Sequence, residues 1–401
     1  MSKISNEELV HKAVITTDTL ATGGKLNDAQ SDRFIDYVVD ETVLKNNARV
    51  VKFRNENLTI DKIGIGNRVA VPKEEAKDPG VRRGINTSKI TLTPREIMVP
   101  FEIGDNFREL NIEGDQVEDT IIRLMSTRLG NDLEELYVHG NKLGPAVLEN
   151  EIHEDGASNQ YVKDSYLSLQ DGWNVLADSG HIVDAEGQNI GLSLFSRAIR
   201  AMPTKFRRNK ANLRWYGPSD LSQIYQEKLS TRATSLGDDA ARGSAPIAPF
   251  GIPYVSVPLW DFNARIVEHV TLTGTTAVSL KNGPIVSGSV VVTPTTLGAT
   301  PVAPYAESTD YTVDYAAGTI VRAGGGNIGS GATVKVTYRA YPELILTHMN
   351  NFIVGIGRDI RIEKDRDIYK GVNQYAITAK VSVLFEEDDA IVKVRNIGMG
   401  V

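Results

Sequence analysis

The stretch that decides the fold is DQVEDTIIRLMSTRLGNDLEELYVHG, residues 115–140. Its apolar residues recur at three- and four-residue spacing, which predicts one long amphipathic helix over 115–139. Asp115 suits the N-cap position, and Gly140 is a stop signal. At 1.5 Å per residue such a helix is roughly 37 Å long. The apolar stripe consists of Val117, Ile121, Leu124, Met125, Leu129, Leu133 and Leu136.

The polar side of this helix is strongly acidic. Residues 106–155 carry 4 basic and 12 acidic side chains, an excess larger than the net charge of −7 of the whole chain. Exposed charges usually form solvated faces, so we expect this side to meet solvent or a partner rather than to line an active site. The acidic residues of the helix are Glu118, Asp119, Asp132, Glu134 and Glu135.

Length and composition limit the classes of protein that the chain can represent. With 401 residues it can hold two or three domains. No apolar run is long enough for a membrane span, and the first 20 residues lack a signal-peptide pattern. The absence of cysteine excludes disulfides and thiolate metal sites. The negative net charge argues against a dedicated nucleic-acid binder.

The segment before the long helix predicts extended structure with little core. Residues 1–49 read as an arm whose second helical pattern places Phe34 and Val38 on an apolar face. Residues 50–105 alternate in polarity and predict a long two-stranded hairpin. An isolated hairpin is marginally stable in water, so we expect it to lie on a neighbouring copy. Its tip is rich in charge: Lys73, Glu74, Glu75, Lys77, Asp78, Arg82 and Arg83.

The segment after the long helix predicts an α/β body. Residues 141–163 read as a polar connection, and residues 164–263 contain helical patterns at 165–177 and 193–202. A Gly/Ala/Ser-rich loop at 235–249 is the best candidate for a mobile segment. Towards the C-terminus, 357–371 reads as a charged excursion between strands.

The composition changes at residue 264. Residues 264–341 contain 10 glycines and only 9 charged side chains, and short β runs alternate with turns. This pattern is typical of a small β-sandwich. Because α/β patterning resumes after Pro342, we interpret the sandwich as an insertion. Its expected strands are 270–272, 288–293, 311–314, 319–322 and 333–338.

Taken in order, these elements resemble the major capsid protein family of tailed bacteriophages. The resemblance rests on an arm, a long hairpin, a spine helix and an α/β body, together with the textures RLGNDLEELYVHGN (128–141), IVGIGRDIRIEKDRD (353–367) and QYAITAKVSVLFEEDDAIVKV (374–394). It covers nearly the whole chain except 264–341, where TDYTVDYAAGTIVR looks like part of an immunoglobulin-like module. It implies an α+β chain with the tailed-phage major capsid fold.

The resemblance also implies a division into domains and a structural role. The chain would self-assemble, as hexamers and pentamers, into an icosahedral shell around double-stranded DNA in the virion, after assembly in the bacterial cytoplasm. Portal, scaffolding or decoration proteins would be further partners, with no enzyme activity, cofactor or membrane. The implied parts are an N-terminal arm (1–49), an extended hairpin loop (50–105), a peripheral domain (106–163 and 343–401), an axial domain (164–263) and an immunoglobulin-like insert (264–342).

Family members that carry a helical scaffolding region at the N-terminus remove it by proteolysis. Here the arm begins almost at Met1, so we expect a separate scaffolding protein, or none, and no cleavage. Some members crosslink a hairpin lysine to a neighbour. Lys73 and Lys77 are placed for that, although solvated loop charges are the favoured interpretation.

Two sets of residues are candidates for intersubunit or DNA contact. The hairpin-tip charges, with Phe34 and Val38, are expected at subunit seams. The tract Lys205, Arg207, Arg208, Lys210, Arg214 could meet DNA phosphates or a seam, and the seam or solvent is favoured because no aromatic stacking platform accompanies it. The acidic run 386–389 reads as a solvated turn, with a divalent-ion site as the alternative.

Catalytic motifs are absent from the sequence. It has no G-x-x-x-x-G-K-[ST], G-x-S-x-G or H-E-x-x-H, and its six histidines show no ligand spacing. Two alternatives to the capsid function stay open: an encapsulin-type compartment of the same fold, and a phage tail or surface-binding protein built around the insert.

Overall fold

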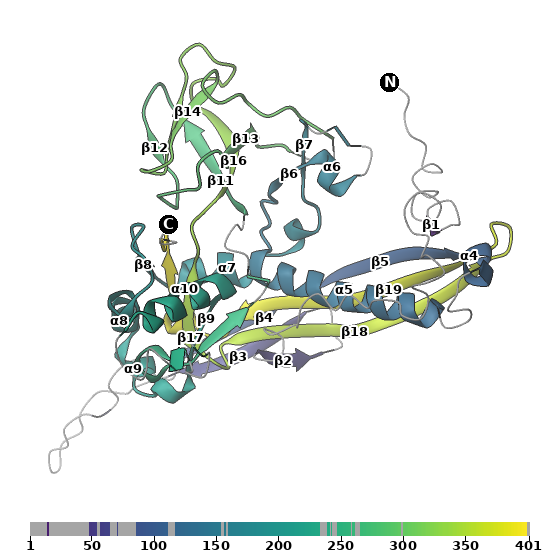
Figure 1. Cartoon of the computed structure of the whole chain (residues 1–401), viewed down its shortest axis with the longest axis horizontal. Coiled ribbons are helices and arrows are strands. Elements are labelled where there is room, and N and C mark those ends of the chain that lie inside the picture. Colours follow the sequence, from purple (N-terminus) through teal and green to yellow (C-terminus); the bar gives the residue numbers. More distant parts are fainter. Residues whose placement is uncertain are drawn as a thin grey trace, which may run out of the picture.

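A computed structural model describes residues 14–15, 48–53, 57–64, 70, 86–110, 117–153, 156–157, 159–232, 239–240, 242, 247–257, 259–260, 265–297 and 300–398. An elongated body carries the inserted β unit above one end (Figure 1). Several residues named from the sequence lie outside the described part: Phe34, Val38, Lys73, Glu74, Glu75, Lys77, Asp78, Arg82, Arg83, Asp115 and most of 235–249.

The long sheet runs along the body with strand order β1-β5-β19-β18-β2. β18 (Phe352–Asp367) and β19 (Val372–Phe385) form its central antiparallel hairpin. β5 (Arg95–Gly104) pairs with β19 along its whole length. β2 (Arg49–Lys52) runs parallel to β18, and β1 (Val14–Ile15) runs parallel to β5.

Helix α5 (Val117–His139) lies along this sheet (Figure 1). The predicted apolar stripe is confirmed, because Ile121, Leu129, Leu133 and Leu136 are buried in one cluster with side chains of β5 and β19. The predicted acidic face is not uniformly solvated. Glu134 is only 1% exposed, since its position on the helix turns it inward between Leu133 and Leu136.

The predicted stop at the end of α5 is confirmed. The helix ends at His139, and the amide of Gly140 donates to the carbonyl of Leu136 at 3.0 Å. A side chain on Gly140 would meet the Gln170 carbonyl oxygen at 2.6 Å, and the Gly172 amide donates to the Gly140 carbonyl at 2.7 Å. Only glycines allow two backbone segments to approach this closely.

This approach explains why 165–177 is not the single helix predicted from its pattern. Gly172 has an extended backbone (ψ 173°) where it packs against Gly140, and this breaks helical continuity. The segment therefore consists of short pieces: η2 (Leu167–Leu169), α7 (Trp173–Leu176) and η3 (Ala177–Ser179).

A second five-stranded sheet forms the other end of the body, with order β10-β9-β17-β20-β8. The predicted helix over 193–202 is present as α8, and α8 and α10 pack on this sheet around a separate apolar cluster. The elements here are β8 (His181–Asp184), α8 (Leu192–Ala201), α9 (Thr204–Arg207), η4 (Lys210–Asn212), β9 (Leu213–Pro218), α10 (Ser219–Ser230), η5 (Pro249–Gly251), β10 (Tyr254–Val257), β17 (Leu344–His348), η6 (Asp388–Ala390) and β20 (Val392–Arg395).

After the insert, the chain crosses between the two sheets twice, and one side chain joins both of these crossings. Asn351 lies just before β18. Its side-chain oxygen accepts a hydrogen bond from the Glu387 backbone amide at 2.8 Å, and its side-chain nitrogen donates to the Glu387 carbonyl at 3.0 Å. Next to it, Phe352 is fully buried and forms edge contacts with Trp173 and Tyr216, at ring-centroid distances of 4.6 and 4.7 Å. The sheets therefore meet at an aromatic cluster held by a buried amide.

The insert contains two three-stranded sheets, β11-β16-β13 and β12-β15-β14, around a shared apolar cluster. Its ends are adjacent, because Arg265 and Arg339 are register partners on β11 and β16. All five predicted strands are present, and two have the predicted bounds. The strands are β11 (Arg265–Leu272), β12 (Val278–Ser279), β13 (Val291–Pro294), β14 (Tyr311–Asp314), β15 (Thr319–Arg322) and β16 (Ala332–Arg339).

The segment predicted as a single hairpin, 50–105, is divided between two structures. The hairpin consists of β3 (Leu58–Gly64) and β4 (Asn86–Leu92), which pair along their full lengths. The strand that alternates most clearly, β5, belongs to the long sheet instead. Alternation marks one buried face, and β5 buries that face against α5 rather than against the hairpin.

Two further predictions are corrected by pairing that the sequence pattern does not reveal. The supposed polar connection contains β6 (Ala146–Leu148), α6 (Glu149–Ile152) and β7 (Tyr161–Lys163), with β6 and β7 antiparallel. The supposed charged excursion contains the far half of β18, whose backbone pairs with β19 while the side chains of 361–366 stay exposed.

We predict that Phe352→Ala destabilises the fold by about 3–5 kcal/mol, because it removes the ring at the junction of both sheets. Chemical denaturation with an extrapolated free energy of unfolding measures this. Tyr369→Ala is the matched control: Tyr369 is fully exposed, and its loss should change stability by less than about 0.5 kcal/mol. Equal effects of the two substitutions would contradict the assigned role of the cluster.

Candidate assembly surfaces

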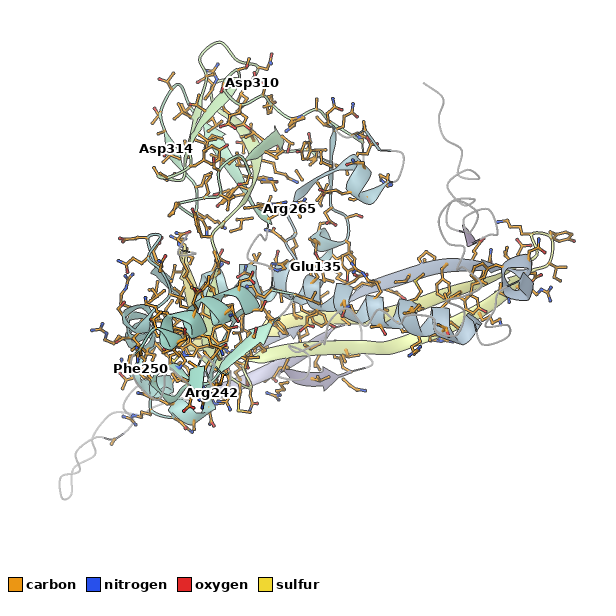
Figure 2. The ribbon with its side chains drawn as sticks, viewed as in Figure 1. Glu135, Arg242, Phe250, Arg265, Asp310 and Asp314 are labelled. Atoms are coloured by element: carbon orange, nitrogen blue, oxygen red, sulfur yellow. The ribbon has the colours of Figure 1, made fainter. Side chains whose placement is uncertain are left out.

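The β6–β7 hairpin lies beside the insert and attaches it to the body (Figure 1). Lys335 on β16 is 2% exposed and donates to the carbonyls of Leu143 and Gly144 at 2.6 and 3.1 Å. Thr337 accepts the Ala146 amide at 3.1 Å. The outer face of the β11-β16-β13 sheet is therefore covered around Lys335 and Thr337, and Arg265 lies at this end of the insert (Figure 2).

Burial perturbs Lys335, the lysine at this contact. Removal from water, and secondarily the nearby charge of Lys163, lower the pKa of Lys335 to about 8. Both hydrogen-bond acceptors of its ammonium are backbone carbonyls, which carry no full negative charge. Docking of the insert thus carries an electrostatic cost below pH 8.

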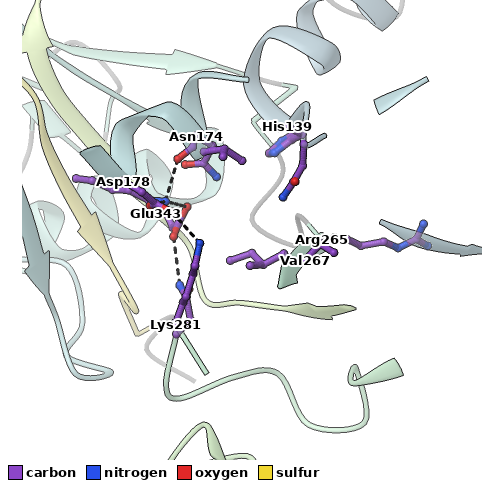
Figure 3. Close-up of a pocket in the computed structure, with 12 residues that line it drawn as sticks. His139, Asn174, Asp178, Arg265, Val267, Lys281 and Glu343 are labelled. Carbon is purple, nitrogen blue, oxygen red and sulfur yellow. Dashed lines mark hydrogen bonds and ion pairs between the residues drawn. The ribbon is translucent and has the colours of Figure 1, made fainter. Parts of the chain in front are cut away.

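A buried ion cluster forms a second contact between insert and body (Figure 3). Lys393 on β20 pairs with Asp178 at 2.8 Å and with Glu343 at 3.0 Å. From the insert, Asn282 donates to Glu343 at 3.2 Å, and Lys281 lies 3.7 Å from Asp178. Burial opposes the charge of Lys393, but the two carboxylates outweigh it and raise the pKa of this lysine. The cluster is therefore a charged lysine held between two acids.

Sequence reasoning did not identify this cluster. Lys393 stands between Val392 and Val394 in a strand that reads as alternating, which indicates a solvated face. That face is instead covered by the segment around Asn174 and Asp178, and the Asn174 carbonyl also accepts from Lys393 at 3.0 Å. The only signal is a lysine inside an apolar run, which is rarely buried without a partner.

The acidic run at 386–389 is an ion-pair cluster within the subunit, which we name the acidic turn. Glu386 pairs with Arg49 on β2 at 3.2 Å, and Glu387 pairs with Lys62 on β3 at 3.4 Å. Asp389 pairs with Lys205 on α9 at 3.0 Å. The turn thus connects the base of the β3–β4 hairpin, the long sheet and the second sheet. The turn is partly exposed, in agreement with the solvated turn predicted from the sequence, and its oxygens also meet lysines and an arginine. The ion site was the alternative considered from the sequence.

The structure divides the basic tract predicted from the sequence. Lys205 is engaged by the acidic turn, and the Arg214 guanidinium donates to the carbonyls of Ala211 and Leu213 at 2.6 and 2.7 Å. Within the described part of the chain, no side-chain partner is seen for the remaining three. The residues left for an external contact are Arg207, Arg208 and Lys210.

The end of the β18–β19 hairpin presents apolar side chains to solvent. Ile368 is 81% exposed, and Tyr369 is fully exposed. The turn is held in place, because Arg366 pairs with Asp105 at 3.0 Å and the Asp105 amide donates to the Gly371 carbonyl at 2.9 Å. This end lies opposite the second sheet along the body (Figure 1). A fixed, exposed apolar pair of this kind suits a contact with another protein.

Within the described ranges, His, Cys, Asp and Glu residues do not gather in groups of three or more, as a metal site would require. Nor does any described helix have the length and apolarity to cross a membrane. The predicted hairpin-tip and arm residues lie outside these ranges, so their proposed seam contacts stay predictions.

Comparison with known proteins identifies one curated relative and several structures of similar fold. No protein-family model matches the chain. The prophage capsid protein YqbE of Bacillus subtilis (strain 168) is 28% identical over 397 residues, covering 97% of this chain and 98% of the relative. The satellite phage P4 procapsid matches with a TM-score of 0.50 and 10% identity, covering 98% of both chains. A chain of Gordonia phage Cozz matches with a TM-score of 0.50 and 10% identity, covering 94% of this chain and 93% of that one.

The chain has the fold of tailed-phage major capsid proteins. The family resemblance and the fold class predicted from the sequence are thereby confirmed. The match to the P4 procapsid chain includes the region of the insert, since it spans 98% of this chain. The immunoglobulin-like character of the insert in this capsid fold stays a prediction, as does the division into peripheral and axial domains.

We predict that Lys335 makes the capsid fold more stable as the pH rises. Its pKa is about 8 in the folded chain against 10.5 unperturbed, so between these values the unfolded chain binds more protons. Stability should therefore increase by about 2 kcal/mol from pH 7.5 to 9.5, relative to Lys335→Met. Denaturant unfolding at both pH values measures the difference. Lys142→Met, an exposed lysine in the adjacent loop, is the control; parallel pH profiles of wild type and Lys335→Met would contradict the prediction.

We predict that Glu386→Gln with Glu387→Gln loosens the hairpin base of the capsid fold. Both pairs are partly exposed, so global stability should fall by less than about 1 kcal/mol, while amide exchange in β2 and β3 should rise several-fold. Hydrogen–deuterium exchange resolved by peptide measures this. Glu363→Gln is the matched control, because it breaks an exposed pair with Arg361 elsewhere on β18. Unchanged amide exchange in β2 and β3 would contradict the prediction that these two ion pairs hold the hairpin in place.

Proposed function

We propose that this chain is the major capsid protein of a tailed bacteriophage, many copies of which form an icosahedral shell around double-stranded DNA. The observation that carries the proposal is the match to a prophage capsid protein over 97% of this chain and 98% of that relative. A match of that extent includes the hairpin, the body and the insert together. The function is structural, because the chain acts by making contacts with other copies of itself and not by catalysing a reaction.

The form of the molecule supports this proposal. Here the buried polar groups join parts of the chain, as Lys393 and Asn351 do. The exposed apolar residues Ile368 and Tyr369 are instead at an extremity, where a neighbour can cover them. Such surfaces are typical of subunits that complete their burial by association.

The finer partners belong to the same proposal. Hexamers and pentamers of this chain would form the shell, assembled in the bacterial cytoplasm, with portal, scaffolding or decoration proteins attached. Of the basic tract, only Arg207, Arg208 and Lys210 are left for DNA phosphates or a subunit seam, since Lys205 and Arg214 are engaged internally. Three cations of this kind suit weak, sequence-independent contact with phosphates.

The two alternative functions differ in what supports them. An encapsulin-type compartment would share the fold and would differ in its contents. A tail or surface-binding protein would rest on the insert alone, whereas the prophage relative matches the chain nearly end to end. The contents of purified particles therefore decide between the first two, and the presence of particles decides against the third.

We predict that the purified chain, expressed with any scaffolding protein encoded beside it, forms closed shells of uniform diameter. Negative-stain electron microscopy measures this, and nuclease-protected DNA in particles isolated from an induced host identifies genome packaging. Shells that contain a cargo enzyme and no DNA would favour the compartment. A stable monomer at high concentration, with or without the scaffolding protein, would overturn the shell function.

A further inference from the structure

The insert and the β6–β7 hairpin enclose a cavity of about 320 Å³. Its walls come from segments far apart in the sequence, which are fixed to each other. Tyr161 on β7 exchanges two backbone hydrogen bonds with Val302 of the insert, at 2.8 and 3.0 Å. The Ala146 amide donates to Thr337 at 3.1 Å on the other side. The cavity is therefore part of a rigid junction, which is the common setting of small-molecule sites.

Two arginines line this cavity from adjacent strands. Arg265 on β11 and Arg339 on β16 are direct register partners in an antiparallel ladder, so their side chains leave the same face of the sheet. Like charges at directly opposed positions are unfavourable in a sheet. An anion beside the two guanidinium groups relieves this repulsion.

One of the two charges is neutralised by the protein. Arg265 contacts both carboxylate oxygens of Glu151, at 2.9 and 3.0 Å. The guanidinium of Arg339 makes no hydrogen bond or ion pair to any described residue, although its backbone is held by Ser289 and Val286. The cavity thus contains one matched and one unmatched guanidinium, and a guanidinium fork is well suited to a carboxylate.

The remaining walls indicate a ligand larger than a simple anion. Leu148, Val286 and Val291 are apolar, Tyr161 is aromatic, and the Ser287 hydroxyl adds a polar group. Apolar walls with a few convergent polar groups suit a compact organic ring that also carries hydroxyls. A volume of about 320 Å³ accommodates one sugar ring. Phosphate or sulfate alone would leave most of the cavity unfilled.

We propose that this cavity binds a carboxylated sugar residue of the hexuronic acid class, with its carboxylate on Arg339 and its ring against Tyr161. Glu151 holds Arg265 back from the ligand and keeps the two guanidinium groups from repelling each other. The inference does not rest on the shell function, because the cavity is complete within one chain.

The test is isothermal titration of the full chain with glucuronate at neutral pH and low salt. Glucose is the neutral probe of the same ring, and glutamate is a carboxylate without the ring. We expect saturable binding of glucuronate, and binding of glucose and glutamate at least tenfold weaker. Arg339→Gln should weaken glucuronate binding about tenfold or more. Lys370→Gln, at the turn between β18 and β19, removes the same charge elsewhere and should leave binding unchanged.

Arg339 is exposed, so its replacement should leave the fold intact, which circular dichroism and thermal unfolding verify. Tyr161→Phe is a second variant that keeps the ring wall and should retain most of the affinity. Absence of saturable glucuronate binding overturns the proposal. So does equal binding of glucose, equal binding of glutamate, or binding that Arg339→Gln leaves unchanged. None of these outcomes depends on whether shells form.

Discussion

The structure depends on the point where two five-stranded sheets exchange strands. The chain leaves the second sheet after β17, enters the long sheet as β18, and returns after β19. Asn351 ties both crossings together by donating to and accepting from the backbone of Glu387, while Phe352 fills the space between the sheets. A buried amide that satisfies a neighbouring backbone cannot be replaced without leaving polar groups unpaired. This constraint fixes the geometry from which the acidic turn, the β18–β19 hairpin and the second sheet all extend.

From this junction, polar contacts inside the subunit have different consequences according to their burial. Lys393 and Glu343 in the ion cluster are almost inaccessible, so loss of either one would leave an uncompensated charge. The acidic turn is exposed, and its pairs with Arg49, Lys62 and Lys205 contribute little net stability. Its role is therefore better described as positioning the hairpin than as stabilising the fold. Weak ion pairs of this kind favour one position of the hairpin but leave other positions accessible.

Much of the fold could be predicted from the sequence because local patterns carried it. The 3.6-residue stripe of α5, the Gly140 stop and the strands 311–314 and 319–322 depend on neighbours in sequence. The predictions that failed depend on distant partners. The pattern of β5 shows one buried face but not which element covers it, and the charged half of β18 is a strand only because β19 pairs with it. The Gly140–Gly172 approach breaks a helix through a contact between segments about thirty residues apart.

The candidate sites follow the same distinction. The basic tract was visible as a cluster of five cations, yet two of them are engaged within the subunit by groups that only the fold brings near. Lys335, Lys393 and Arg339 each stand in an alternating strand, and a period-two pattern assigns such residues to a solvated face. In the insert, the part of that face around Lys335 is covered by the β6–β7 hairpin, which the sequence presents as a polar connection. Where this face is covered, its charges have partners: Lys335 uses carbonyls and Arg265 uses Glu151, whereas Arg339 stays exposed beside the cavity. The insert is thus fixed to the body by polar contacts on this covered part of its sheet, and it is not joined to the body by its two chain connections alone.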